Sequence, residues 1–95
     1  MKFRSKNLLV TGGAGFIGSN FINYLVKKYK SINVINLDLL TYAGCLANTK
    51  NFKDSPNYFF VRGDISDYKI VNKIFKQFQI DGVINFAAES HVDNS

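Results

Sequence analysis

The stretch Val10-Thr11-Gly12-Gly13-Ala14-Gly15-Phe16-Ile17-Gly18 decides how this chain is expected to fold. The apolar run Leu8-Leu9-Val10 leads into it and is short enough for a buried strand. The apolar residues that follow recur at helical spacing: Ile17, Phe21, Ile22, Leu25 and Val26. The glycines are therefore predicted to form a strand-to-helix turn.

Each glycine has a role at such a turn. Gly12 allows the tight bend, Gly15 lets the backbone approach a phosphate without a Cβ in the way, and Gly18 lets the helix pack close to the strand. Because a helix N-terminus offers free N–H groups and a positive dipole, the turn is predicted to hold the pyrophosphate of a dinucleotide. The alternative is an ordinary glycine-rich turn.

A second strand with an acid at its end supports the dinucleotide prediction. The motif requires a carboxylate about 20 residues beyond the turn, to accept hydrogen bonds from the adenosine ribose. Asp38 is 20 positions after Gly18 and ends the run Asn33-Val34-Ile35-Asn36-Leu37. A carboxylate suits a free 2′-hydroxyl and repels a 2′-phosphate, and the next base along the chain is Lys50, so NAD is favoured over NADP.

Strand and helix patterns alternate along the rest of the chain. We expect strands at 8–11, 33–37, 58–61 and 83–87, helices at 17–29 and 67–78, and a loop from Asp38 to about Asn57. Ser66 is the expected N-cap of the second helix. This order predicts an α/β fold, a Rossmann-type parallel sheet with helices on its faces, and right-handed crossovers give the strand order 3-2-1-4.

That strand order brings four loops to one edge of the sheet, at 12–18, 38–41, 63–65 and 87–91. Asp64 is then placed to accept a hydrogen bond from the adenine amino group, with Ile65 against the ring; the alternative for Asp64 is a turn or capping role. Ala87 and Ala88 are small where the sheet passes close to the cofactor, or they are ordinary packing residues.

Length and composition exclude several other classes of protein. Ninety-five residues with 46% hydrophobic content make one small domain, and no run approaches the ~20 apolar residues of a membrane span. The single cysteine, Cys45, forms no internal disulfide and the N-terminus lacks a signal-peptide pattern, so a cytoplasmic protein is expected. One cysteine and one histidine argue against a metal site.

The net charge of +5 does not predict a nucleic-acid surface, because the basic residues are scattered over separate elements. Lys69, Lys73 and Lys76 follow helical spacing on the solvent side of the second helix. The expected core side of that helix is formed by Ile70, Val71, Ile74, Phe75 and Phe78. We expect neither a nucleic-acid partner nor a membrane partner.

Four segments resemble the extended short-chain dehydrogenases/reductases, the NAD-dependent epimerase/dehydratase family, and within them the sugar-nucleotide 4,6-dehydratases. They are Thr11-Gly12-Gly13-Ala14-Gly15-Phe16-Ile17-Gly18-Ser19-Asn20, Asp38-Leu39-Leu40-Thr41-Tyr42-Ala43-Gly44, Gly63-Asp64-Ile65 and Asn85-Phe86-Ala87-Ala88-Glu89-Ser90-His91-Val92-Asp93. The second and fourth are the selective ones. Two residues depart from the family pattern: Cys45, where Asn is usual, and Asn94, where many members have Arg.

The resemblance implies which residues contact NAD. Together with Gly12, Gly15 and Gly18 they are Phe16, Ile17, Asp38, Leu39, Leu40, Thr41, Asp64, Ile65, Phe86, Ala87, Ala88, Glu89 and Ser90, of which Ser90 would also face the sugar nucleotide. It also implies an activity for the full-length, homodimeric protein: oxidation at C4 of a nucleotide hexose such as dTDP-glucose, elimination of water across C5 and C6, and return of the hydride to C6.

The catalytic residues of the family, a Tyr-x-x-x-Lys pair and an acid for the elimination, are expected beyond residue 95, as is the substrate domain. Tyr24-Leu25-Val26-Lys27-Lys28 matches the pair but ends the first helix, away from the cofactor loops, and Ser90, His91 and Asp93 are too close in sequence to form a triad. We therefore expect residues 1–95 to be the N-terminal part of an NAD-binding domain, without catalytic residues. Alone it would be inactive, and poorly soluble or oligomeric because its last strand is uncovered.

Two other functions stay open. The cofactor half of a UDP-sugar epimerase or decarboxylase has the same glycine turn, although Tyr42-Ala43-Gly44 and Glu89-Ser90-His91 argue against it. The chain could instead be a stand-alone NAD-binding module or the remnant of a truncated gene. Titration with NAD separates these last two, because a self-sufficient module binds with saturation.

Overall fold

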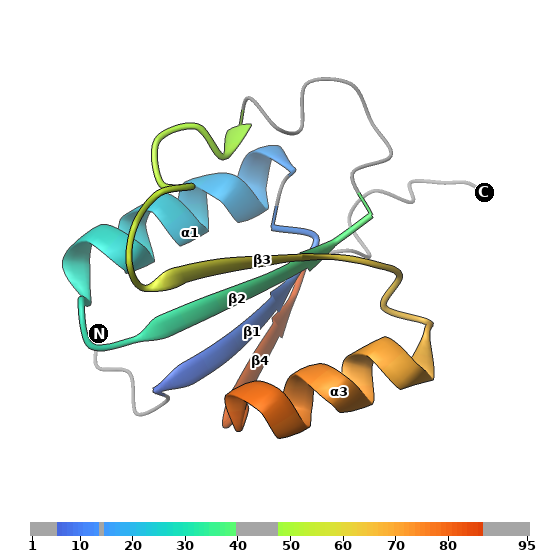
Figure 1. Cartoon of the computed structure of the whole chain (residues 1–95). Helices are drawn as coiled ribbons and strands as arrows, with labels where there is room; N and C mark the ends of the chain where they lie inside the picture. The colour runs from blue at the N-terminus through green and yellow to red at the C-terminus, as the bar shows by residue number, and fades with distance from the viewer. Residues whose placement is uncertain (1–5, 14, 40–47, 87–95) are drawn as a thin grey trace.

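The computed structural model describes residues 6–13, 15–39 and 48–86, and shows a parallel sheet with a helix on each face (Figure 1). Along the chain the elements are β1 (Asn7–Thr11), α1 (Phe16–Lys28), β2 (Asn33–Asp38), β3 (Tyr58–Arg62), α3 (Tyr68–Phe78) and β4 (Gly82–Asn85). These are the six elements expected from the sequence, with bounds that differ by at most two residues. Residue 87, the expected end of the last strand, lies outside the described residues.

The sheet has the strand order β3-β2-β1-β4, with every neighbouring pair parallel. This confirms the Rossmann-type order. The chain moves outward from β1 to β3 and then returns past β1 to reach β4 on the other side. Right-handed crossovers in opposite directions place α1 and α3 on opposite faces of the sheet (Figure 1).

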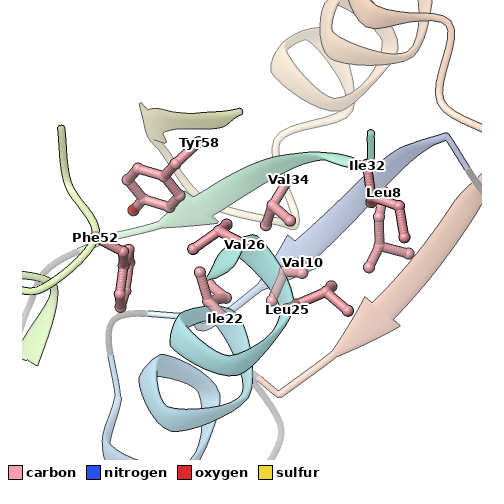
Figure 2. Close-up of a cluster of buried hydrophobic side chains, with 9 residues drawn as sticks. All are labelled: Leu8, Val10, Ile22, Leu25, Val26, Ile32, Val34, Phe52 and Tyr58. Carbon is pink, nitrogen blue, oxygen red and sulfur yellow. The ribbon is translucent and has the colours of Figure 1, made fainter. Parts of the chain in front are cut away.

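The larger part of the core lies between the sheet and α1. It is lined by Leu8, Val10, Ile22, Leu25, Val26, Ile32, Val34, Phe52 and Tyr58, which Figure 2 shows gathered around α1. The apolar positions of α1 recur at helical spacing, so its inner face is continuous and buried. β1 and β2 are central strands covered on both faces, which is why they read as near-continuous apolar runs.

The segment 48–57, expected only as a loop, contributes to this core. Phe52 is fully buried, and its ring packs edge-on against the Tyr58 ring at 4.8 Å between centroids. Asn57 is buried as well, and its Nδ2 donates to the carbonyl oxygens that end α1 and lead out of it, those of Val26, Tyr29 and Ile32. One amide group therefore anchors the end of α1 to the start of β3.

A smaller core lies under α3, formed by Leu9, Ile35, Leu37 and Ile74. Two expectations for this helix are corrected by the structure. The N-cap is Asp67 and not Ser66: the Asp67 carboxylate accepts the Lys69 N–H at 3.1 Å, whereas the Ser66 N–H donates to Asp64 and belongs to the preceding turn. Phe75 is 40% exposed and not part of the core, because only Ile74 of this helix is fully covered.

Candidate cofactor site

The carboxyl ends of the four strands lie at the same edge of the sheet. The residue that follows β1, Gly12, donates its N–H to Leu37 at 3.0 Å. Gly63, after β3, donates to the Asp38 carbonyl at 3.1 Å, and Phe86, after β4, donates to the Thr11 carbonyl at 2.7 Å. Each loop therefore starts from a position fixed by the neighbouring strand. This is the edge at which open α/β sheets bind ligands.

The glycine turn has the backbone that the sequence predicts. Gly12 has φ of 74°, a left-handed conformation that favours glycine, and this confirms its role in the tight bend. The Gly15 N–H donates to the Gly12 carbonyl at 3.3 Å, and Gly15 is the N-cap of α1 with φ −72° and ψ 174°. The turn therefore places the N-terminus of α1 at the carboxyl edge of the sheet.

Gly18 is required for close packing, but against a different partner from the one expected. A Cβ on Gly18 would lie 2.7 Å from the Gly12 carbonyl oxygen and 2.9 Å from Gly13 Cα. At Gly18 the helix thus packs on the backbone of the turn that follows the strand. Gly13 is also closely packed, against side chains, since its Cβ would lie 2.7 Å from Asn36 Cγ.

The two helices differ in how their N-termini are satisfied. α3 is capped by the Asp67 carboxylate, whereas α1 has a glycine N-cap, no side-chain capping bond and no acid in its first turn. The first N–H groups of a helix need an acceptor, and uncapped ones attract anions. The start of α1 therefore fits a diphosphate, and the start of α3 does not.

Apolar side chains are exposed around the start of α1 and along the sheet edge. Phe16 is 75% exposed and Ile17 55%, and both belong to the first turn of α1. Leu39, after β2, and Ile65, after β3, are each 42% exposed. All four were expected to contact the cofactor. Exposed apolar groups beside an anion site suit a ligand with both a charged diphosphate and a flat apolar ring.

Asp38 ends β2 at the same edge and is 5% exposed. Its register partner in β3 is Arg62, which is exposed. The sequence did not predict Arg62 as a neighbour of Asp38, because the two residues are distant in sequence and meet only through strand pairing. A basic side chain beside the ribose position can pair with the 2′-phosphate of NADP. Because Arg62 lies there, the predicted preference for NAD over NADP depends on the Asp38 carboxylate.

Asp64 has the turn role that was its alternative. Its carboxylate accepts the Ser66 N–H at 2.9 Å, and this backbone hydrogen bond holds the pKa of Asp64 below its ordinary value. The Asp64 carbonyl also accepts the Asp67 N–H, which leads the chain into α3. Contact with adenine stays a prediction.

Other residues of the site were missed by the sequence analysis. Thr11 Oγ1 donates to Asn85 Oδ1 at 2.5 Å, which joins the ends of β1 and β4. Asn36 lies fully buried below the turn, where its Oδ1 accepts the Gly13 N–H. The signal was a single polar residue inside the apolar run Val34-Ile35-Asn36-Leu37, because a buried amide needs a partner.

The remaining predicted site residues, Leu40, Thr41, Ala87, Ala88, Glu89 and Ser90, lie outside the described residues, as does His91. The Tyr24 and Lys28 pair is described: the Lys28 ammonium lies 5.8 Å from the centre of the half-exposed Tyr24 ring. Both belong to the second half of α1, which runs away from the glycine turn (Figure 1).

Within residues 6–13, 15–39 and 48–86 no helix has the length and apolar character needed to span a membrane. In the same part of the chain no three His, Cys, Asp or Glu side chains are grouped so as to hold a metal ion.

The chain is similar to a known family of sugar-nucleotide enzymes. A family model described as GDP-mannose 4,6 dehydratase matches residues 9–95. A probable dTDP-glucose 4,6-dehydratase of Sinorhizobium fredii is 56% identical over 90 residues, which are 93% of this chain and 25% of that protein. The chain thus spans about a quarter of the length of the curated dTDP-glucose 4,6-dehydratases it matches.

Solved structures agree with the sequence comparison. The dTDP-glucose 4,6-dehydratase of Bacillus anthracis, in complex with NAD, superposes with a TM-score of 0.82 at 47% identity, over 85% of this chain and 26% of that one. The dTDP-glucose 4,6-dehydratase of Streptomyces venezuelae, with NAD and TYD bound, gives a TM-score of 0.77 at 46% identity, over 92% of this chain and 28% of that one.

Proposed function

The chain belongs to the GDP-mannose 4,6 dehydratase family, and from this premise we propose that it forms the NAD-binding part of a nucleotide-sugar 4,6-dehydratase that acts on dTDP-glucose. The relatives at about half identity carry that activity in their names, and the similar solved structures hold NAD. Bound NAD would supply a hydride acceptor at C4 of the hexose and, later in the same turnover, the hydride that returns at C6.

The observation that carries the proposal is the start of α1. Its uncapped N–H groups face the sheet edge, the glycine turn leaves no room for a Cβ at Gly13 or Gly18, and Asp38 ends the neighbouring strand. In this arrangement the first turn of α1 binds the diphosphate and the Asp38 carboxylate accepts from the ribose hydroxyls. Phe16, Ile17, Leu39 and Ile65 shield the bound ligand from water.

On the nicotinamide side, the proposed contacts with NAD are made by residues 87–90, and Ser90 also faces the sugar nucleotide. These roles, like those of Leu40 and Thr41, rest on the resemblance in their sequence segments. Phe86 is the described residue that leads into the first of these segments, and its N–H is already fixed on Thr11 at the sheet edge.

We further propose that the 95 residues bind NAD without turning over a nucleotide sugar, since the relatives are about four times as long. Incubation of the purified chain with NAD and dTDP-glucose should give no 4-keto-6-deoxy product. A separate incubation with NAD and UDP-glucose, assayed for conversion to UDP-galactose, tests the epimerase alternative. Product from either would contradict the proposal.

The Asp38→Asn variant tests the cofactor assignment. Calorimetric titration of the unmodified chain should show saturable NAD binding and weaker NADP binding, because the carboxylate repels a 2′-phosphate. Asp38→Asn should weaken NAD binding and narrow the gap between the two cofactors. Arg62→Gln is the matched control: it removes the neighbouring base, so it should weaken only NADP. Equal NAD affinity in Asp38→Asn would remove Asp38 from the ribose.

A further inference from the structure

One buried amide group lies directly below the glycine turn. Asn36 is in the middle of β2, between Ile35 and Leu37, and no part of its side chain reaches solvent. Its Oδ1 accepts the Gly13 N–H at 2.9 Å, and its Nδ2 donates to the Tyr58 hydroxyl at 3.0 Å. A buried amide destabilises a core unless both of its ends are bonded, and here both are.

The first bond fixes the shape of the turn. The Gly12 N–H is held by the Leu37 carbonyl and the Gly13 N–H by the Asn36 side chain, so two successive peptide groups of the turn are bonded to two successive residues of β2. The turn also closes down on Asn36, since a Cβ on Gly13 would lie 2.7 Å from Asn36 Cγ. The left-handed Gly12 is thereby tied on both of its sides.

The second bond fixes the amide itself. An Asn side chain can turn about its terminal bond. The Gly13 N–H can only donate, so it selects the Oδ1 end of the amide, and the Tyr58 hydroxyl holds the Nδ2 end. Tyr58 is in turn held by the Phe52 ring at 4.8 Å, as Figure 2 shows for the two rings beside α1. Burial raises the pKa of the Tyr58 phenol above its ordinary 10.0, so the hydroxyl keeps its proton at neutral pH.

We propose that Asn36 is a positioning residue for the cofactor: it holds the Gly13 N–H so that the glycine turn keeps its binding shape before the diphosphate arrives, and Tyr58 holds the other end of its amide. This inference rests on the proposed function, because it assigns Asn36 to the same diphosphate site. A turn that is already ordered loses less conformational freedom on binding, and affinity gains accordingly. Asn36 touches the turn and does not touch the ligand.

The test compares two buried asparagines. Asn36→Leu removes both bonds of the amide while keeping the number and branching of the side chain's heavy atoms. Asn57→Leu is the matched control, because Asn57 is also buried and bonded but holds the far end of α1. Tyr58→Phe removes only the second bond and remains measurable if Asn36→Leu does not fold. Asn36→Asp is the conservative variant, since a carboxyl group accepts from Gly13 and can also bond the Tyr58 hydroxyl.

Three quantities are measured on the full chain under conditions where each variant is folded: the urea midpoint, the exchange protection of the Gly13 amide without ligand, and the Kd for NAD. We expect Asn36→Leu to lose the Gly13 protection and to bind NAD about tenfold more weakly, with a smaller change in both for Tyr58→Phe. Asn36→Asp should restore both. Asn57→Leu should lower the urea midpoint while leaving the Gly13 protection and the Kd unchanged.

The two ways of failing are distinct. If the unmodified chain binds no NAD, the proposed function fails and the role of Asn36 with it. If the unmodified chain binds NAD and Asn36→Leu binds it equally well, or if Asn57→Leu weakens binding as much as Asn36→Leu, only the positioning role is overturned.

Discussion

The two helices lie on opposite faces of one sheet and both begin at its carboxyl edge, yet they are built in opposite ways. α1 buries a continuous apolar face and leaves its N-terminus without a side-chain cap. α3 has a carboxylate cap but fully buries only Ile74, beside a Phe75 that is 40% exposed and a β4 residue, Val83, that is 51% exposed.

This contrast separates two requirements of a binding domain. A helix that must offer bare N–H groups to a ligand cannot be stabilised at that end by its own side chains, so its stability has to come from packing along its length. α1 has such packing. The N-terminus of α3 is not part of the candidate ligand site, so the Asp67 side chain can accept one of its free N–H groups. Among the described residues, α3 is accordingly packed along less of its length than α1.

The largest expected effect concerns the two packed faces. Leu25→Ala on α1 should lower the free energy of unfolding by about 3 kcal/mol, because the deleted side chain is fully buried and leaves a cavity. Phe75→Ala on α3 should cost less than about 1 kcal/mol, since its ring is already partly in water. Urea unfolding followed by circular dichroism measures both. Equal losses would mean that the two faces are equally packed.

A second prediction concerns the contact between α1 and the turn. Gly18→Ala should destabilise the fold by about 2 kcal/mol, although alanine favours helix, because its Cβ meets the Gly12 carbonyl oxygen of the backbone. Gly63→Ala is the control at the same edge, where the nearest atom is the end of the Ile70 side chain at 2.5 Å. That atom can move, so thermal unfolding should shift less for Gly63→Ala.

A third prediction concerns the difference in N-terminal capping between α1 and α3, which is tested by adding a cap to α1 and removing the cap from α3. Gly15→Asp should add a capping carboxylate to α1, since the Gly15 backbone is extended. It should weaken NAD binding at least about tenfold, because its charge repels the diphosphate and its side chain occupies the space that Gly15 leaves open. Asp67→Ala should instead cost about 1 kcal/mol of stability and leave NAD affinity unchanged. A Gly15→Asp variant that binds NAD normally would exclude the α1 N-terminus as the anion site.

The smallest expected effect concerns the connection between α3 and β4, where Asp81 is bonded to the start of β1. The Asp81 carboxylate, just before β4, accepts the N–H groups of Lys6 and Asn7 at 3.1 Å. These backbone bonds lower the pKa of Asp81 below its ordinary 3.8. Their contribution to stability is therefore present above about pH 4 and is lost as the pH falls through the folded pKa.

Asp81→Asn tests this attachment. The variant should have a slightly lower urea midpoint at pH 6 than the unmodified chain and should lose less stability between pH 5 and pH 3. Parallel pH profiles for the two proteins would show that the exposed bonds of Asp81 contribute nothing measurable.

Much of the fold follows from local patterns. The glycine spacing, the period of α1 and the apolar runs of β1 and β2 are each contained within about 30 residues, so the sequence predicted six elements, their order and the sheet edge that binds ligands. The N-cap of α3 was placed one residue early because Ser66 and Asp67 have equal capping chemistry. Only the fold shows that the Ser66 N–H is taken by Asp64.

The sequence by itself determined the glycine turn, the acid at the end of β2 and the parallel sheet, because each depends on neighbours along the chain. The tertiary structure alone decided that Asn36 holds Gly13, that Phe52 closes the core and that Arg62 lies beside Asp38. The contacts of Asn36 with Gly13 and of Arg62 with Asp38 join residues more than 20 positions apart, and Phe52 joins a core formed from several elements. Strand pairing and burial, which no local pattern encodes, bring these residues together.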